Sequence, residues 1–321
     1  MRAALLCELG RPPEPSDVPE PTRPGADALV EVLATPLNPI DIAAGAGRFY
    51  GGHPPLPYVP GCEAVGKVLK SEAHAPGTLV WAHGAGLGVK RDGGLAERLV
   101  APPEALLPLP EDADPVLAGA LGIAGLAGWL PLAWRAPVRG GETVLVLGAT
   151  GTVGLVAVQA ARLLGAGRVV AAGRSREGLE RASRAGAAAT VALEEGDIAR
   201  RLRDACGGEG PNLVLDPLWG EPLTAALEAA APAARIVNVG QSAGPQATLR
   251  SAAVRGKQLE LLGYSNFAAP PDVVAREYRR LLGHAAAGDV RVDVEQVPFA
   301  DVSSAWRRQA EGAGCKLVVV P

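Results

Sequence analysis

A glycine-rich turn between an apolar strand and an amphipathic helix constrains the fold of this chain more than any other feature. Residues 142–165 read ETVLVLGATGTVGLVAVQAARLLG, in which Thr143–Leu147 predicts a buried strand and a helix is expected from about Thr152. The glycines let the backbone approach a ligand closely, and the helix start presents free N–H groups and a positive dipole end. This order predicts a pyrophosphate site formed by Thr150, Gly151, Thr152, Val153 and Gly154. The alternative interpretation is a tight turn that binds no ligand.

The next strand indicates which dinucleotide is bound. Gly167–Ala172 is expected to continue the βαβ order, and it leads into Gly173, Arg174, Ser175 and Arg176. A site that prefers NADH would place an Asp or Glu at the end of this strand to bind the ribose 2′-hydroxyl. Here a glycine stands in that place, and the two arginines and the serine can bind a 2′-phosphate through charge-assisted hydrogen bonds. We therefore expect NADPH. The alternative is that both arginines only solvate a helix start, where cations are slightly disfavoured.

Length and composition favour a two-domain globular enzyme. A chain of 321 residues is longer than a single hydrophobic core usually accommodates, so two domains are expected. A content of 48% hydrophobic and 20% charged residues excludes a disordered or fibrous chain. The net charge of −3 provides no general attraction to nucleic acid or to an anionic membrane. The sequence contains no run of eighteen uninterrupted apolar residues, so no membrane span is predicted. The N-terminus becomes acidic and proline-rich too soon for a signal peptide. The cytoplasm is the expected compartment.

The cysteines do not predict a metal or disulfide framework. Cys7, Cys62, Cys206 and Cys315 are widely separated and form no CxxC pair. A structural zinc site needs four clustered ligands, so we expect most of these side chains to be isolated, buried thiols.

The spacing of apolar runs predicts two kinds of domain. Residues 1–118 read as short strands separated by Pro and Gly, and the last apolar strand, Lys316–Val320, is expected to complete that domain. Residues 119–265 read as a small-residue helix followed by a doubly wound α/β region. The expected strands are Ala28–Ala34, Ala64–Lys70, Thr78–Ala82, Glu97–Ala101, Ala189–Ala192, Asn212–Asp216, Arg235–Val239, Leu259–Leu262 and Val290–Val297, and the expected helices are Ala118–Leu132, Asp197–Cys206, Glu221–Ala231 and one from Asp272.

A series of short motifs resembles the medium-chain dehydrogenase/reductase superfamily, specifically its zinc-free NADPH-dependent quinone oxidoreductase branch. Besides the glycine turn, the motifs are, in chain order, Asn38-Pro39-Ile40-Asp41, Gly47, Phe49-Tyr50, Pro57-Tyr58-Val59-Pro60-Gly61-Cys62-Glu63, Gly66, Gly93-Gly94-Leu95-Ala96-Glu97, Leu109-Pro110, Leu215-Asp216-Pro217, Val239-Gly240-Gln241-Ser242-Ala243-Gly244 and Lys316-Leu317-Val318-Val319. The resemblance covers nearly the whole chain. It implies a GroES-like β-rich catalytic domain of residues 1–118 completed by 266–321, and a Rossmann NADPH-binding domain of residues 119–265. It also implies a cleft between the domains for nicotinamide and substrate, and a homodimer formed through the last strand of the Rossmann sheet.

The chain departs from the zinc enzymes of that superfamily where the catalytic metal would bind. By motif position, the three zinc ligands fall on Asn38, Cys62 and Ile123, and one thiol cannot hold a catalytic zinc. A site built from Cys62, Glu63 and either His53 or His83 is the disfavoured alternative, because no second soft ligand is near. Without a Lewis acid, oxidation of a simple alcohol is not expected.

The resemblance also suggests residues around the substrate. Asn38 is expected to contact substrate or the nicotinamide ribose, with capping of the turn before Pro39 as the alternative. Asp41 is expected to brace the same loop, and Tyr50 is a candidate hydrogen-bond or proton donor, unless it is only a structural aromatic or Phe49 holds that place. Further coenzyme contacts are expected from the loops after two later strands, at Gly240, Gln241, Ser242, Tyr264 and Ser265.

These features favour hydride transfer to an acceptor that is already activated. The expected function is a zinc-independent, NADPH-dependent reduction of a quinone or an α,β-unsaturated carbonyl compound, in which the coenzyme supplies the chemistry and the protein positions it. The alternatives are an enone or enoyl-thioester double-bond reductase of secondary metabolism and an NADPH-binding sensor that has no turnover.

Overall fold

The structure of the protein, a computed structural model, describes residues 1–23, 25–194 and 196–321 and divides into two compact units. Unit 1 comprises Met1–Ile123 and Asp293–Pro321, and unit 2 comprises Ala124–Val292. The chain therefore returns to unit 1 at Asp293, whereas the sequence placed this return at residue 266.

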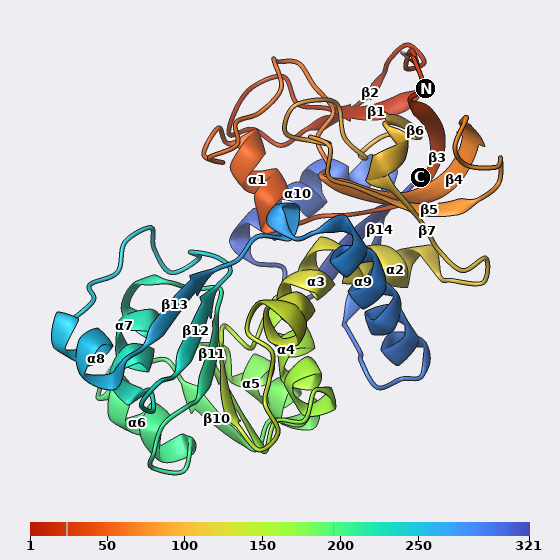
Figure 1. Ribbon diagram of the computed structural model, residues 1–321. Helices are drawn as coiled ribbons and strands as arrows, with labels where there is room; N and C mark the ends of the chain where they lie inside the picture. Colours follow the sequence, from red (N-terminus) through yellow and green to blue (C-terminus); the bar gives the residue numbers. More distant parts are fainter. Residues whose placement is uncertain (24, 195) are drawn as a thin grey trace. The chain divides into compact units, whose positions relative to one another are not determined.

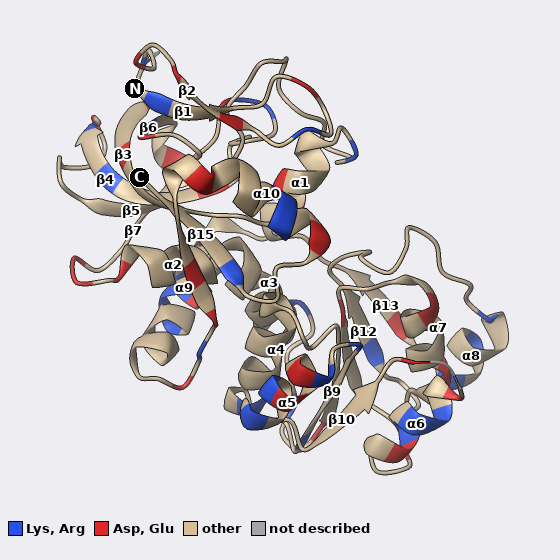
Figure 2. Ribbon diagram, turned by 180° about the vertical axis from the view of Figure 1, so that it is seen from behind, with Lys and Arg blue, Asp and Glu red and all other residues tan. Residues whose placement is uncertain are grey.

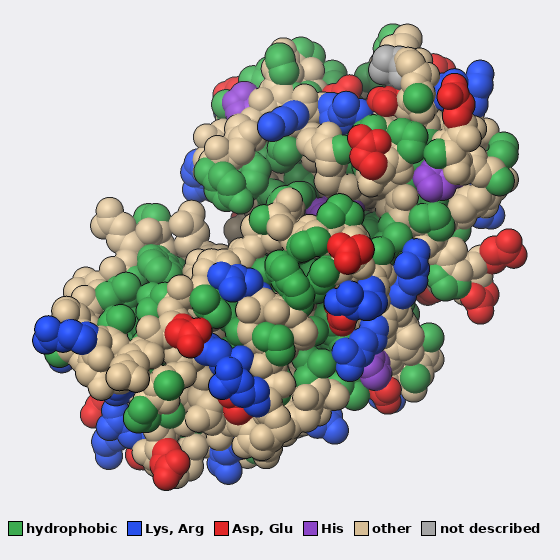
Figure 3. Space-filling model, viewed as in Figure 1, with side chains coloured by type: hydrophobic (Ala, Val, Ile, Leu, Met, Phe, Trp, Pro, Cys, Tyr) green, Lys and Arg blue, Asp and Glu red, His purple; other side chains and the backbone are tan. Residues whose placement is uncertain are grey.

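The difference arises from helix α9 (Pro271–Ala286), which belongs to unit 2. The buried carboxylate of Glu277 accepts a hydrogen bond of 3.0 Å from Trp129 Nε1, and the backbone N–H of Arg291 donates to Gln159 Oε1 at 2.8 Å. Basic side chains gather on the outer face of this helix (Figure 3), where the Arg280 guanidinium lies 5.3 Å from the centre of the Trp129 ring.

Unit 2 contains a doubly wound parallel sheet, as the sequence predicts (Figure 1). Its strands lie in the order β10-β9-β8-β11-β12-β13, and every neighbouring pair is parallel. The strands are β8 (Thr143–Leu147), β9 (Arg168–Gly173), β10 (Ala189–Ala192), β11 (Leu213–Asp216), β12 (Arg235–Asn238) and β13 (Glu260–Gly263). The helices are α3 (Ile123–Leu130, which begins at the last residue of unit 1), α4 (Thr152–Leu163), α5 (Arg176–Arg184), α6 (Ile198–Ala205), α7 (Gly220–Ala229), α8 (Ser251–Lys257) and α9, with the 3₁₀ turn η3 (Asn266–Ala268).

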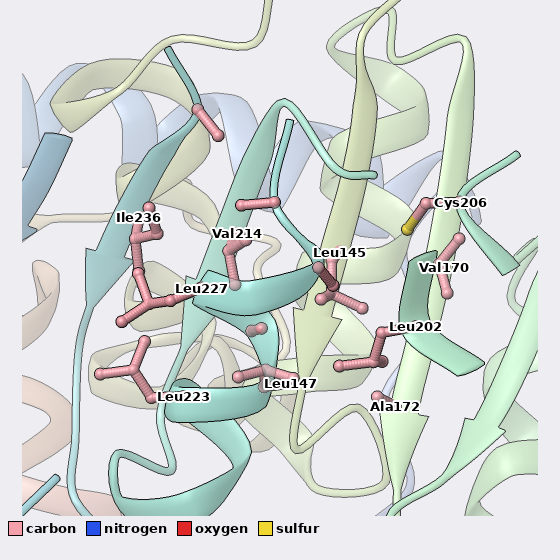
Figure 4. Close-up of a cluster of buried hydrophobic side chains, with 14 of the residues drawn as sticks. Leu145, Leu147, Val170, Ala172, Leu202, Cys206, Val214, Leu223, Leu227 and Ile236 are labelled. Carbon is pink, nitrogen blue, oxygen red and sulfur yellow. The ribbon is translucent and has the colours of Figure 1, made fainter. Parts of the chain in front are cut away.

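Branched apolar side chains on one face of this sheet pack against α6 and α7 (Figure 4). Leu145 pairs in register with Val170 on one side and with Val214 on the other, and all three are fully buried. Leu202 of α6 and Leu223 and Leu227 of α7 belong to the same buried cluster. Such burial of large aliphatic side chains contributes about 2 kcal/mol each.

Unit 1 is built from both ends of the chain, as expected from its last strand. Its sheet has the order β14-β15-β3-β4-β5-β7, and β6 pairs with β3. β15 is antiparallel to β3 and parallel to β14, so the C-terminus completes a sheet begun near the N-terminus. The strands are β1 (Arg2–Leu5), β2 (Glu14–Asp17), β3 (Ala28–Pro36), β4 (Glu63–Lys70), β5 (Leu79–His83), β6 (Arg98–Ala101), β7 (Leu106–Pro108), β14 (Val294–Pro298) and β15 (Lys316–Val320). The helices are α1 (Pro39–Gly45), α2 (Pro115–Leu121) and α10 (Val302–Glu311), with the 3₁₀ turns η1 (Pro103–Ala105) and η4 (Phe299–Asp301).

The single helix predicted over Ala118–Leu132 is interrupted. α2 ends at Leu121, α3 follows from Ile123, and a π-helical turn, η2 (Pro131–Arg135), completes the segment. The interruption occurs at Gly122, where an added Cβ would clash with the Glu63 carboxylate, and this carboxylate accepts the Ile123 N–H at 2.8 Å. Within the described ranges, no single helix is long and apolar enough to cross a membrane, although the broken pair Pro115–Leu121 and Ile123–Arg135 passes that test together.

Candidate active site

The glycine turn lies at the point of the unit 2 sheet where the strand order reverses. From β8 the chain runs outward through β9 and β10, and then returns to the other side of β8 with β11. Ligands of open parallel sheets bind outside the carboxyl ends of the strands at this point. Gly148 has a φ of +61°, and a Cβ there would lie 3.0 Å from the side chains of Pro217 and Leu218. The turn after β8 is thus packed directly against the loop after β11.

The backbone of the turn is shaped to accept a pyrophosphate. A Cβ on Gly154 would lie 2.4 Å from the Gly148 carbonyl oxygen, so only glycine lets α4 start this close to the turn. The space beside Gly151, in contrast, is open, with the nearest atom 4.0 Å from an added Cβ. α4 begins at Thr152, as predicted, and the N–H groups of its first turn, including Val153, are available to an anion. These residues fit a bound dinucleotide.

No carboxylate stands at the end of β9. The strand ends in buried Gly173, which exposed Arg174 follows. Ser175 is the N-cap of α5, and its Oγ accepts the Gly178 N–H at 3.1 Å. Arg176 is almost fully exposed and lies 3.5 Å from the Glu180 carboxylate, one of the acidic and basic residues interspersed along α5 (Figure 2).

One further arginine, not predicted from the sequence, contacts the glycine turn. Arg181 Nη2 donates to the carbonyl oxygen of Thr150 at 3.4 Å, so α5 is bonded to the glycine turn. In the sequence, the only indication of this contact is that Arg181 lies three residues after Gly178, on the same face of α5.

A buried carboxylate holds the loop after β11. Asp216 is fully buried and accepts the backbone N–H groups of Leu218 and Trp219, each at 2.9 Å. Asn238, at the end of β12, donates through Nδ2 to Asp216 Oδ2 at 3.0 Å and to the Gly240 carbonyl at 2.7 Å. Burial raises the pKa of Asp216, and these hydrogen bonds partly offset that rise. Asn238 was not predicted from the sequence, where its position at a strand end is the only signal.

The remaining predicted coenzyme residues lie in loops at the same edge of the sheet. Gln241 is exposed, and Ser242 donates through Oγ to the Pro217 carbonyl at 3.1 Å. Tyr264 donates through its backbone N–H to the Asn238 carbonyl at 3.0 Å and through its hydroxyl to Asn266 Oδ1 at 2.6 Å, while Ser265 precedes η3. The structure therefore brings these residues to the carboxyl edge of one sheet, because parallel strands end on the same side.

Asn38 belongs to a buried polar network in unit 1. Its Nδ2 donates to Glu63 Oε1 at 2.8 Å, and its Oδ1 accepts from Lys316 Nζ at 2.6 Å. Glu63 Oε2 accepts from Trp81 Nε1, also at 2.8 Å. The Asn38 side chain is 1% exposed. Both polar ends of its amide are thus bonded within unit 1, and its assignment as a contact of substrate or of the nicotinamide ribose stays a prediction.

Burial dominates the electrostatics of this network. Desolvation raises the pKa of Glu63 to about 7, although the charge of Lys316 and three hydrogen bonds oppose it. Desolvation likewise lowers the pKa of Lys316 to about 8, against the charges of Glu63 and Asp41. Asp41 accepts the backbone N–H groups of Asn38 and Cys62, each at 2.8 Å, which confirms that it braces this loop.

Asn38, Cys62 and Ile123, at the motif positions of the zinc ligands, provide one thiol among them. Cys62 is buried. Desolvation raises the pKa of its thiol, and the nearby charge of Asp41 raises it further. The side chain of Ile123 is apolar, and His83 stacks on Trp81 with its pKa lowered to about 4 by burial. Among residues 1–23, 25–194 and 196–321, no three His, Cys, Asp or Glu side chains form a group that could hold a metal ion.

The two aromatic candidates in the loop after α1 are in contact with each other. The Tyr50 ring lies 4.4 Å from that of Phe49 and is 86% exposed. Its assignment as a hydrogen-bond or proton donor stays a prediction.

Comparison with known proteins agrees with this geometry. Residues 24–111 match the family "Alcohol dehydrogenase GroES-like domain", and residues 152–282 match the family "Zinc-binding dehydrogenase". The quinone oxidoreductase-like protein 2 of Bos taurus is 32% identical over 266 residues, which are 82% of this chain and 74% of that protein. Among solved structures, the quinone oxidoreductase of Thermus thermophilus, also determined in complex with NADPH, is 30% identical with a TM-score of 0.82, and each chain is fully covered. An NAD-dependent alcohol dehydrogenase is 29% identical with a TM-score of 0.89, again over the whole of both chains.

The two folds and the two family matches define an oxidoreductase of the medium-chain dehydrogenase/reductase superfamily. Within that superfamily, the chain belongs to the quinone oxidoreductase branch. The predicted family and fold class are both confirmed.

Proposed function

We propose that this protein is a zinc-independent reductase that uses NADPH to reduce a quinone or an α,β-unsaturated carbonyl compound. The observation that carries the proposal is the end of β9, where Gly173 and exposed Arg174 stand in place of a carboxylate. A carboxylate there would repel a 2′-phosphate, whereas a guanidinium binds it through charge-assisted hydrogen bonds.

The residues of unit 1 support an acceptor that needs no metal. A bound NADPH supplies a hydride, and the carbonyl group of a quinone or enone spreads the negative charge that develops in the acceptor. Asn38, Cys62 and Ile123 occupy the motif positions of a zinc ligand set, and their side chains provide one buried thiol among them. In our proposal Asn38 and Glu63 position the loop before α1, and the Tyr50 hydroxyl or water supplies the proton.

The decisive experiment measures NADPH oxidation with a panel of quinones and enones, together with metal analysis of the same preparation. Turnover with quinones and no stoichiometric metal supports the proposal. Turnover confined to enones or enoyl thioesters identifies a double-bond reductase, and tight NADPH binding without turnover identifies a sensor. Stoichiometric zinc would refute the zinc-independent mechanism.

A charge reversal tests the coenzyme preference separately. Arg174→Asp should weaken NADPH binding by tenfold or more and leave NADH binding nearly unchanged, because only NADPH carries the 2′-phosphate. Arg184→Asp, at the other end of α5, is the matched control and should affect neither coenzyme. Equal losses of NADPH and NADH affinity in Arg174→Asp would mean that this arginine does not contact the phosphate.

We also propose that the protein forms a homodimer through β13. This strand is an edge of the unit 2 sheet, and it is largely exposed, with Leu261 36% exposed. An edge strand offers unpaired backbone groups to a second copy. Light scattering should give a dimer for the wild type and a monomer for Leu261→Lys, and a wild-type monomer would contradict the proposal.

A further inference from the structure

The side chain of Thr150 fills the space between two glycines on neighbouring elements. Gly173 ends β9, and Gly178 lies in the first turn of α5. A Cβ on Gly173 would lie 2.4 Å from Thr150 Cγ2, and a Cβ on Gly178 would lie 2.5 Å from Thr150 Cβ. Carbon atoms in ordinary contact are about 3.5–4.0 Å apart. Neither glycine can therefore gain a side chain while Thr150 keeps this place.

This requirement for glycine is steric and not conformational. Neither Gly173 nor Gly178 has a positive φ, so another residue could adopt the same backbone. What excludes a side chain at the end of β9 is the γ-methyl group of Thr150. Cγ2 lies 2.4 Å from the position of a Cβ on Gly173, whereas Thr150 Oγ1 and Cβ lie 3.3 and 3.4 Å from it.

Hydrogen bonds on both sides hold Thr150 in place. The N–H of the preceding Ala149 donates to the Ala172 carbonyl of β9 at 3.0 Å. The Thr150 carbonyl accepts from Arg181, whose Nη1 also donates to Glu177 Oε1 at 3.1 Å. The backbone of the turn is thus bonded to β9 and to α5, so it cannot withdraw from Gly173 and Gly178 without breaking these bonds.

We propose that Thr150 determines the coenzyme specificity of this chain by excluding a carboxylate from the end of β9. An Asp or Glu in that place is the group that binds the 2′-hydroxyl of NADH and repels the 2′-phosphate of NADPH. The residue at the end of β9, which meets the ribose, is then limited by the packing of the loop that receives the pyrophosphate. This inference rests on the proposed preference for NADPH, and it names the residue that maintains it.

The steric part is tested without any coenzyme. Gly173→Ala should lower the midpoint of thermal unfolding, and adding Thr150→Ser, which removes only Cγ2, should restore most of the loss. Gly178→Ala is the matched control, because its Cβ would lie 2.7 Å from Thr150 Cγ2 but also 2.5 Å from Thr150 Cβ, which serine retains. Thr150→Ser should not rescue that variant. Equal rescue of both variants, or rescue of neither, would overturn the proposal.

The specificity part is tested by fluorescence titration with NADPH and NADH. Gly173→Asp alone should weaken the binding of both coenzymes at least tenfold, because the turn must move to admit the side chain. In the Thr150→Ser background the same substitution should restore NADH binding while NADPH stays weak. The ratio of Kd(NADPH) to Kd(NADH) should then rise at least tenfold above that of Thr150→Ser alone.

The two failures can be told apart. If Gly173→Asp alone binds NADH as tightly as the double variant does, Thr150 does not control specificity and the inference is wrong. If the wild-type chain binds NADH more tightly than NADPH, the proposed coenzyme preference fails, whatever the unfolding data show for the Thr150 methyl group.

Discussion

Glu63→Gln should remove a pH dependence of stability that the wild-type protein carries between about pH 4.5 and 7. In the folded protein, burial raises the pKa of Glu63 from 4.5 to about 7 against the opposing effects of Lys316, Asn38, Ile123 and Trp81. The folded state then binds this proton more tightly than the unfolded state. The contribution of Glu63 to stability is therefore fully present below about pH 4.5 and is lost as the pH rises to 7.

The size of the effect follows from the interval between the two pKa values. Each unit corresponds to about 1.4 kcal/mol, so the interval from 4.5 to about 7 corresponds to about 3 kcal/mol. Glutamine binds no proton, so wild type should lose about that much stability relative to the variant over this range. Losing the carboxylate also removes one of the two negative charges, Glu63 and Asp41, that raise the pKa of Lys316. A lower pKa of Lys316 favours the variant as the pH rises, which changes the difference in the same direction.

The assay is urea unfolding followed by tryptophan fluorescence at several pH values from about 5 to about 7.5. Staying below pH 8 keeps the wild-type Lys316 mostly charged, since its pKa is about 8. Glu31→Gln on β3, where the side chain is exposed, is the matched control and should follow the wild-type curve. Parallel curves for wild type and Glu63→Gln would refute the reasoning, because the ionisation of Glu63 would then be uncoupled from folding.

Two further predictions concern the glycine turn and the thiols. Gly154→Ala should lower the thermal unfolding midpoint of unit 2 and abolish coenzyme binding, since its Cβ would lie 2.4 Å from the Gly148 carbonyl oxygen. Gly151→Ala meets no atom nearer than 4.0 Å, so it should keep the wild-type midpoint and weaken only coenzyme binding; a loss of stability there would contradict the open space seen beside it. In thiol titration with a chromogenic disulfide, exposed Cys7 should react at once, whereas Cys62, buried and with a raised pKa, should react only after unfolding. Rapid labelling of Cys62 in the native protein would show that this site opens.

Local patterns in the sequence were sufficient for much of the fold. The strands Thr143–Leu147, Ala189–Ala192 and Lys316–Val320 and the start of α4 at Thr152 occur where predicted. In each case, apolar periodicity and flanking turn residues specify the element without reference to distant parts of the chain. The helix expected over Ala118–Leu132 was interrupted because Gly122 lies against the carboxylate of Glu63, about sixty residues earlier.

By itself, the sequence determined the fold class, the position of the glycine turn and the missing carboxylate after β9, because each depends on residues close together in the chain. Only the tertiary structure decided that Asn38 forms hydrogen bonds with Lys316 and Glu63, and that the side chain of Thr150 packs against Gly173. These contacts join residues from about twenty to nearly three hundred positions apart, and no local pattern records which of them meet. Their energies come from burial and close packing, which exist only when the elements have assembled.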